Sequence, residues 1–244
     1  MADEAAFVEA LQEAARTAER GYLVCLGVVA SAPATGYGYI KTGEPLHTAQ
    51  ATAMVERFVE KPTAADARQM LADGGYLWNA GIFAWRVYAY RQAMEKFQPA
   101  LAEALDQIAA LHRTPGWISE VRDILEPVAA ISIDIGIAEP AAADGRMAVV
   151  PLEAGWSDIG SWSALLEALS ARSGASLVAS GQHLDRGSER VLVHGGERLV
   201  VTVGLRDIII VDTPDALLVC ARDRAEEIKP VLDEIAEKAG ERYL

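Results

Sequence analysis

Residues 23–29 read Leu23-Val24-Cys25-Leu26-Gly27-Val28-Val29, an unbroken apolar run. A run of this length without polar alternation is typical of a strand buried on both faces, as in a parallel or mixed sheet covered by helices. The preceding residues favour an amphipathic helix that begins after Asp3 and stops at Gly21. A helix followed by a buried strand indicates an α/β architecture. The apolar positions at helical spacing are Phe7, Leu11, Ala14, Ala15 and Ala18.

Capping residues and chain breakers predict the elements that follow this strand. Thr63, with Asp66 three residues later, is typical of a capped short helix that ends at Gly74-Gly75. Further expected elements are a strand at 54–59 stopped by Pro62, two helices within 87–111 broken near Pro99, a strand at 147–150, and a helix capped by Ser161 that carries Leu165, Leu166 and Leu169.

Beyond about Gly174 the pattern changes to short apolar strands separated by Gly, Asp and Pro turns, which predicts a small β unit. A final helix carries an apolar stripe that must cover either this β unit or another subunit. We therefore expect two domains, residues 1–172 and 173–244. The strands are expected at 191–193, 199–203, 208–211 and 216–219, and the stripe consists of Ile228, Val231, Leu232 and Ile235.

Composition excludes several classes of function. A net charge of -13 argues against nucleic acid as a partner, because neutralising a phosphate backbone needs a basic surface. The N-terminus lacks the basic flank and apolar core of a signal peptide, and no apolar run approaches the ~20 residues of a membrane span. Cys25 and Cys220 lie in apolar runs without metal-site or redox spacing. We expect a cytoplasmic protein with two reduced core cysteines and no membrane partner.

Familiar catalytic signatures are missing from the sequence. The segment Gly155-Trp156-Ser157-Asp158-Ile159-Gly160 places its second glycine one residue too late for the nucleophile elbow of a serine hydrolase. The four histidines show no metal-ligand spacing, and neither a P-loop nor a G-x-G-x-x-G motif occurs. These absences direct attention to phosphate and sugar binding by other residues.

Four polar or glycine positions remain as site candidates. Gly36 and Gly38 would let backbone amides approach a ligand closely, and Glu60 with Lys61 lies at a strand end, where open α/β sheets place their ligand crevice. A carboxylate there can accept hydrogen bonds from sugar hydroxyls while the ammonium faces a phosphate, although a solvated strand end fits equally well. Two further candidates have two interpretations each: Asn79 as a hydroxyl-binding or a turn residue, and Asp158 as a Mg²⁺ ligand or a helix cap.

Taken in order, five segments resemble the bacterial mannose-1-phosphate guanylyltransferases, a family of sugar-phosphate nucleotidyltransferases. Their spacing covers nearly the whole chain, and the tail at 211–217 resembles the family's short β-helical region. The matching segments are Thr35-Gly36-Tyr37-Gly38-Tyr39-Ile40, Phe58-Val59-Glu60-Lys61-Pro62, Tyr76-Leu77-Trp78-Asn79-Ala80-Gly81-Ile82-Phe83, Ser132-Ile133-Asp134 and Gly155-Trp156-Ser157-Asp158-Ile159-Gly160-Ser161-Trp162.

The resemblance implies a fold and a reaction. The fold is an incomplete Rossmann-like nucleotidyltransferase domain with a mixed sheet, followed by a small left-handed β-helix-like region and a terminal helix. In the reaction, mannose 1-phosphate and GTP give GDP-mannose and pyrophosphate with Mg²⁺ as cofactor, which needs positioning and charge neutralisation rather than a covalent nucleophile. The residues implied to bind the sugar phosphate are Gly38, Glu60, Lys61, Asn79, Gly81 and Asp134; Lys61 and Asp158 are implied to be catalytic, with Asp158 as the metal ligand.

The sequence also departs from the family pattern. It contains no G-G-x-G-T-R-L-W-P-L-S-R nucleotide loop and no Ala-Asp-His segment, and Asp134 is followed by Ile135-Gly136-Ile137-Ala138-Glu139 where the family usually has Tyr-Ala-Val-Met-Glu. We therefore expect an open sheet edge beside residues 23–29 that promotes self-association. We also expect a homodimer or a partner chain that supplies the missing half. The alternatives are a noncatalytic sugar-phosphate-binding or assembly subunit, and a transferase for another sugar or base.

Overall fold

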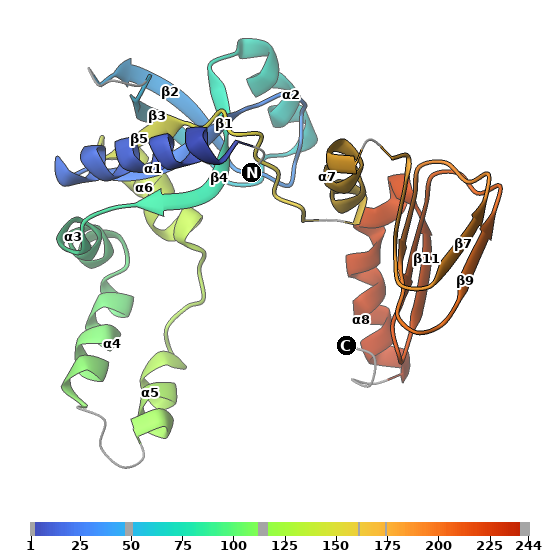
Figure 1. Ribbon diagram of the computed structural model, residues 1–244. Helices are drawn as coiled ribbons and strands as arrows, with labels where there is room; N and C mark the ends of the chain where they lie inside the picture. The colour runs from blue at the N-terminus through green and yellow to red at the C-terminus, as the bar shows by residue number, and fades with distance from the viewer. Residues whose placement is uncertain (1–2, 47–50, 112–116, 161, 174, 240–244) are drawn as a thin grey trace. The chain divides into compact units, whose positions relative to one another are not determined.

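The chain is described by a computed structural model at residues 3–46, 51–111, 117–160, 162–173 and 175–239 (Figure 1). It divides into two units, Met1–Trp156 and Ser157–Leu244, each of which has its own core. Among the described helices, none is long and apolar enough to cross a membrane.

The first unit is built around a five-stranded sheet that closes on itself in the order β1-β4-β2-β3-β5. The sheet is mixed, because β5 runs parallel to β1 whereas the other neighbouring strands are antiparallel. The elements are α1 (Glu4–Glu19), β1 (Leu23–Val29), β2 (Tyr39–Pro45), β3 (Ala53–Val59), α2 (Ala64–Asp73), β4 (Tyr76–Ala84), α3 (Val87–Phe97), α4 (Pro99–Ala110), α5 (Trp117–Leu125), the π-helix η1 (Asp134–Ala138), α6 (Glu139–Ala143) and β5 (Met147–Pro151).

Strand β1 is buried on both faces, as its apolar run predicts. Val24 and Leu26 pack in the cluster that holds the small residues of α1, whereas Leu23 and Cys25 pack in the cluster under α3, α4 and α6. Burial raises the pKa of the Cys25 thiol, which agrees with an inert core cysteine. The expected open edge beside this strand is wrong, because β1 pairs with β4 on one side and with β5 on the other.

Local signals in the sequence correctly place α1, α2 and the break between α3 and α4. The Asp3 side chain accepts a hydrogen bond from the Ala6 N–H at 3.0 Å, and the Thr63 hydroxyl accepts one from the Asp66 N–H at 3.2 Å. Pro99 begins α4, where its missing N–H costs no helical hydrogen bond. Figure 1 shows α4 and α5, which contact each other, extending away from the sheet.

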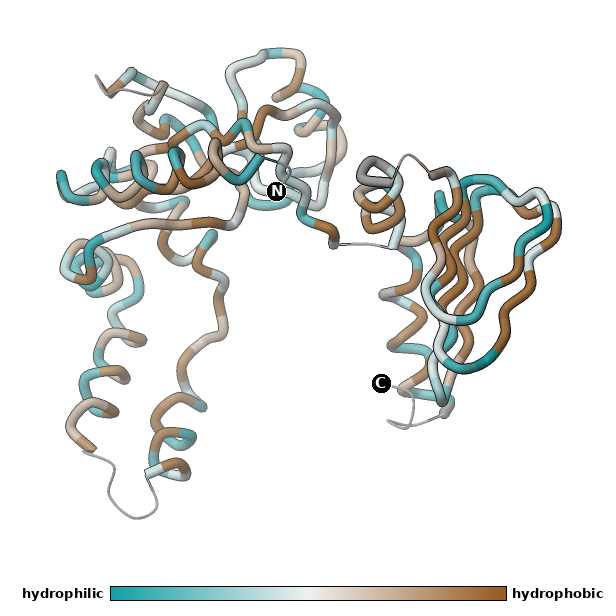
Figure 2. The backbone as a smooth tube through the Cα atoms, in the orientation of Figure 1, coloured by the Kyte–Doolittle hydropathy of each residue, from teal (hydrophilic) through white to brown (hydrophobic). Residues whose placement is uncertain are grey.

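The second unit arranges its short strands in two sheets. In the four-stranded sheet β11-β10-β8-β6, the strands β6, β8 and β10 are parallel and β11 is antiparallel, while β7 and β9 form a separate parallel pair. Figure 2 shows hydrophobic residues running along these strands. The elements are α7 (Trp162–Ser173), β6 (Leu177–Ser180), β7 (His183–Arg186), β8 (Val191–His194), β9 (Val200–Val203), β10 (Ile208–Asp212), β11 (Leu217–Ala221), the 3-10 helix η2 (Arg222–Glu227) and α8 (Ile228–Ala239).

Helix α7 packs with the strands of the second unit. Leu166 of this helix is buried in one cluster with Leu192 of β8 and Ile209 of β10. The structural boundary therefore falls between Trp156 and Ser157, whereas the sequence pattern places the domain boundary at 172/173. The cap that was expected for this helix, Ser161, lies outside the described residues.

The terminal helix α8 buries only part of its apolar stripe. Ile228 packs against the cluster that contains Leu166, whereas Val231 and Leu232 remain 46% and 42% exposed. The stripe that the sequence predicts is therefore present, and part of it is left uncovered by this chain's described residues.

Candidate functional site

Antiparallel pairing brings the predicted site residues of three strands together. At the end of the sheet, Tyr39 of β2 lies opposite β3 on one side and β4 on the other. Gly38 precedes Tyr39, while Glu60 and Asn79 each come one residue beyond its two partners, so all three lie side by side. The Asn79 N–H donates to the Gly38 carbonyl at 2.8 Å, which continues the ladder by one more bond.

A neighbouring side chain occupies the space beside Gly38. A Cβ at this position would lie 2.6 Å from Glu60 Oε2 and 3.3 Å from the Asn79 Cβ. From the sequence, this glycine was expected to admit a ligand, but in the structure the space beside it holds the Glu60 carboxylate. A Cβ at Gly36 would meet nothing within 4 Å among the described atoms.

Glu60 and Lys61 form a sharp turn directly after β3. Lys61 has φ +44, a left-handed conformation that costs free energy for a residue with a Cβ. Its Nζ lies 3.6 Å from Glu60 Oε1, and the Lys61 side chain is 66% exposed whereas that of Glu60 is 14% exposed. The turn thus presents an ammonium to solvent and keeps a carboxylate within the protein.

The surroundings of Glu60 disfavour its charged form. Burial is the main reason why the pKa of its carboxyl is raised above 4.5, and the carboxylates of Asp134 and Glu139 raise it further. Lys61 acts in the opposite direction by charge and hydrogen bonding. The pKa of Glu60 thus depends on its burial and on the charges of Asp134, Glu139 and Lys61.

Asn79 links the strands to the π-helix η1. Its Nδ2 donates to Asp134 Oδ1 at 2.9 Å, and its Oδ1 accepts the Gly81 N–H at 3.1 Å. Gly81 has φ +68, a backbone conformation that suits glycine. Asn79 is 8% exposed, so these bonds fix its amide orientation within a largely buried site.

Glu139 and a group of aromatic rings complete the cluster and were not singled out as site residues from the sequence. Glu139 Oε1 accepts the Glu60 N–H at 2.9 Å. The Tyr37 ring lies 5.0 Å from Trp78 and 5.6 Å from Trp156, measured between ring centroids. Within the described residues the Trp78 indole N–H is buried without an acceptor. The signal for Tyr37 and Trp78 was their place next to Gly38 and Asn79 in the sequence.

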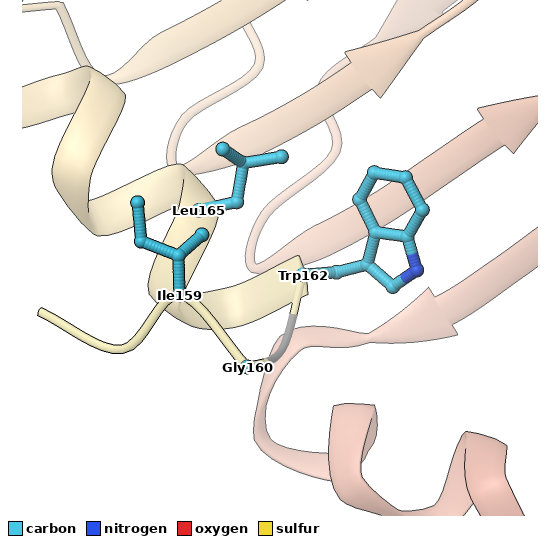
Figure 3. Close-up of a pocket in the computed structure, with 4 residues that line it drawn as sticks. All are labelled: Ile159, Gly160, Trp162 and Leu165. Atoms are coloured by element: carbon cyan, nitrogen blue, oxygen red, sulfur yellow. The ribbon is translucent and has the colours of Figure 1, made fainter. Parts of the chain in front are cut away.

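The remaining candidate, Asp158, lies in the second unit. Its carboxylate is exposed and folds back on its own loop, since a Cβ on Gly160 would lie 2.7 Å from Asp158 Oδ1. The residues that follow Asp158 line a pocket of about 260 Å³, which is formed by Ile159, Gly160, Trp162 and Leu165 (Figure 3). In the described part of the chain, no three His, Cys, Asp or Glu side chains are grouped so as to hold a metal ion.

The first-unit cluster is suited to a polar, phosphorylated ligand. Glu60, Asp134 and Glu139 supply carboxylate oxygens that can accept from hydroxyls, and Asn79 supplies an oriented amide. Lys61 supplies an exposed cation for a phosphate. Among the described residues, the groups of this cluster are carboxylates, an amide and an ammonium, which suit binding and transfer of a charged group.

Comparison with protein families assigns both parts of the chain. Residues 1–173 match the family model described as "Nucleotidyl transferase". Residues 181–235 match that described as "MannoseP isomerase/GMP-like beta-helix domain". The two matches agree with an α/β domain followed by a β-rich region.

Curated relatives are similar over almost the whole chain. The xanthan biosynthesis protein XanB of Xanthomonas campestris is 40% identical over 234 residues, covering 96% of this chain and 48% of XanB. The mannose-1-phosphate guanylyltransferase of Escherichia coli is 36% identical over 239 residues, covering 97% of this chain and 50% of that protein. The chain thus spans about half the length of the curated relatives that it matches.

A solved structure shows the same fold. A crystal structure from Thermus thermophilus, described as a mannose-1-phosphate geranyltransferase, matches with a TM-score of 0.77 at 28% identity, covering 96% of this chain and 66% of that one. Sequence, fold and family model therefore agree, and the chain belongs to the nucleotidyl transferase family.

Proposed function

We propose that this chain carries the sugar-phosphate site of a mannose-1-phosphate guanylyltransferase, an enzyme that converts mannose 1-phosphate and GTP into GDP-mannose and pyrophosphate. The observation that carries the proposal is the Glu60-Lys61 turn, held against Gly38 and Asn79. A relative at 36% identity has that enzyme's name, and this supports the choice of sugar and base.

Each side chain of the cluster has a distinct task in this proposal. The exposed Lys61 ammonium binds the sugar's phosphate, and the Glu60 carboxylate accepts a hydroxyl hydrogen bond. Asn79 and Asp134, tied to each other at 2.9 Å, offer their remaining donor and acceptors to other hydroxyls. A phosphate oxygen then attacks the α-phosphorus of GTP, and the bond to the β-phosphate breaks so that pyrophosphate leaves.

Asp158 is our proposed Mg²⁺ ligand. An exposed carboxylate fits this ion, which is commonly held by one or two carboxylates together with substrate phosphates and water. The ion would supply positive charge to the phosphates. In an active assembly, Asp158→Asn should raise the Mg²⁺ concentration needed for half-maximal rate; an unchanged titration would leave the helix-capping role.

Calorimetry with mannose 1-phosphate tests the central assignment. Lys61→Ala should weaken binding about tenfold or more, because a hydrogen bond to a charged group contributes roughly 1.5–3 kcal/mol. Lys61→Gly should weaken it as much, while accepting the positive φ without strain. Lys238→Ala on α8, another exposed lysine, is the matched control. Equal affinity of the wild type and both Lys61 variants would reject the assignment.

Ligand controls separate this function from its alternatives. Mannose without phosphate and inorganic phosphate should each bind more weakly than mannose 1-phosphate, because each engages only one part of the cluster. A preference for another hexose 1-phosphate would indicate a different sugar specificity. Sugar-phosphate binding that persists without turnover in every assembled form would favour a noncatalytic binding subunit.

A further inference from the structure

One contact of the cluster comes from outside the sheet. The Glu60 N–H lies beyond the last paired residue of β3, so the sheet gives it no acceptor. Glu139, 79 residues further along the chain, fills this place with Oε1 at 2.9 Å. A backbone group at the edge of the site is therefore satisfied by a side chain, and its position depends on that side chain.

The turn that Glu139 holds is under strain. Lys61 has φ +44 and is followed by Pro62, and a residue before proline is normally restricted to extended backbone. Such a conformation persists only when its surroundings fix it. The hydrogen bond from the Glu60 N–H to Glu139 is one contact that fixes this conformation, because it lies one residue before the strained Lys61.

The π-helix η1 explains how Glu139 reaches the turn. In an α-helix, residues five apart point about 140° away from each other, since each residue turns the helix by about 100°. In η1 the Glu139 N–H bonds to the Asp134 carbonyl, and this wider turn brings residues five apart back toward one side. Asp134 contacts Asn79 while Glu139 contacts Glu60, so the two ends of one π-turn hold two strands of the site.

Another residue stabilises the π-turn itself. Gln98, at the junction of α3 and α4, donates from Nε2 to the Gly136 carbonyl at 3.2 Å. A Cβ at Gly136 would lie 3.3 Å from the same Nε2 and 3.1 Å from Ile131 Cγ2, so the space is matched to glycine. The π-turn is thus fixed from both sides.

We propose that Glu139 is a positioning residue for the sugar-phosphate site: it fixes the Glu60-Lys61 turn so that the Lys61 ammonium faces the phosphate. The inference rests on the proposed function. A contact made only for stability would not need a charge here, because a second carboxylate next to Glu60 opposes that residue's ionisation. The tight fit of η1 instead places two acceptors at the site at once.

Two substitutions of Glu139 test the proposal by calorimetry with mannose 1-phosphate. Glu139→Ala removes the acceptor and should weaken binding about tenfold or more, as small displacements of binding groups do. Glu139→Gln keeps an oxygen for the Glu60 N–H and should bind within about threefold of wild type, because the neutral bond replaces the charged one. Glu103→Ala, on α4, is a control for loss of a carboxylate elsewhere in the unit.

Hydrogen exchange at the Glu60 amide gives a readout that does not need a ligand. Exchange should become faster in Glu139→Ala and stay slow in Glu139→Gln. If Glu139→Ala does not fold, Glu139→Asp, whose shorter side chain cannot reach the amide, takes its place. A wild type that binds no hexose 1-phosphate would refute the proposed function. Wild-type binding with unchanged affinity in the folded Ala or Asp variant, or a Gln variant as weak as Ala, would refute the role of Glu139.

Discussion

At the scale of single residues, a substitution of Gly38 should affect ligand binding much more than the stability of the fold. An added Cβ would lie 2.6 Å from Glu60 Oε2, the far end of a flexible side chain, so the carboxylate can move and the backbone can stay. We expect Gly38→Ala to weaken mannose 1-phosphate binding about tenfold or more, since misplaced binding groups lose affinity steeply. Its melting temperature should fall by only about 2–4 °C, the effect of roughly 1 kcal/mol in a chain of this size.

Gly36→Ala is the matched control for this substitution. A Cβ at Gly36 meets nothing within 4 Å, and Gly36 is not among the glycines with positive φ, so both binding and stability should remain near wild type. Calorimetry and thermal unfolding of the two variants measure both effects. Equal binding by Gly38→Ala would show that the Glu60 carboxylate does not contact the ligand.

We expect the ionised Glu60 carboxylate to destabilise the folded protein at neutral pH, and we attribute its presence to ligand binding. Because its pKa is raised in the fold, chiefly by burial, its contribution to stability is full below its ordinary pKa of 4.5 and is lost as pH rises through the raised value. Glu60→Gln should therefore unfold at a higher temperature than wild type at pH 7, and the difference should close below about pH 4.5. Thermal unfolding across this range is the measurement. A less stable Gln variant at pH 7 would mean that Lys61 and hydrogen bonding outweigh the burial of Glu60.

At the scale of elements, local sequence patterns predicted the features that neighbouring residues determine. The buried strand at 23–29, the caps at Asp3 and Thr63 and the break at Pro99 were all predictable, because each depends on nearby residues. The π-turn at 134–138 was not, since its hydrogen bonds are fixed by Gln98 and by contacts to distant strands. For the same reason no role could be predicted for Glu139, whose partner is 79 residues away.

The pair β7 and β9 illustrates an element held by a polar network. Thr202 is buried and donates its hydroxyl hydrogen to Asp185 Oδ1 at 2.7 Å. Its single hydrogen is then used, so His183 Nε2, 2.9 Å away, must be the donor to Thr202. Ser188 also bonds to the Asp185 carboxylate through its backbone N–H at 3.2 Å. Hydrogen bonds from Ser188 and Thr202 lower the pKa of Asp185 to about 2.

This network predicts a pH dependence for the second unit. A carboxyl with a lowered pKa contributes stability above its ordinary value of 3.8 and loses it as pH falls toward about 2. Asp185→Asn should therefore speed hydrogen exchange in residues 183–203 at pH 7 and lower the stability of this unit. Denaturant unfolding should show the gap to wild type shrinking between pH 4 and about pH 2. A gap that is constant with pH would mean that the carboxylate charge is not what matters.

At the scale of the whole molecule, charge and strand pairing constrain the function together. The chain carries a net charge of -13, and its described site has one lysine among the carboxylates of Glu60, Asp134 and Glu139. Such a site can bind hydroxyls and one phosphate but offers little charge for a triphosphate.

The closing of the sheet by β5 could not be predicted from the apolar run, because pairing joins residues over 120 positions apart. With β1 paired on both sides, the expected self-association loses its main cause. Exposed apolar side chains remain, among them Val231 and Leu232 of α8.

Turnover by the 244-residue polypeptide depends on how it could hold a triphosphate. We expect it to bind mannose 1-phosphate but not to release pyrophosphate from GTP, because its sequence contains neither a P-loop nor a G-G-x-G-T-R-type loop to surround the triphosphate. Calorimetry with Mg-GTP and a pyrophosphate-release assay should both be negative, whereas mannose 1-phosphate binding depends on Lys61. The Lys61→Ala variant serves as the blank for the pyrophosphate-release assay. Turnover on the order of 1 per second or more that is abolished in that variant would show that this polypeptide contains a complete nucleotide site. Binding of the sugar phosphate alone would make Lys61 and Glu139 parts of an acceptor site that works with nucleotide-binding residues from elsewhere.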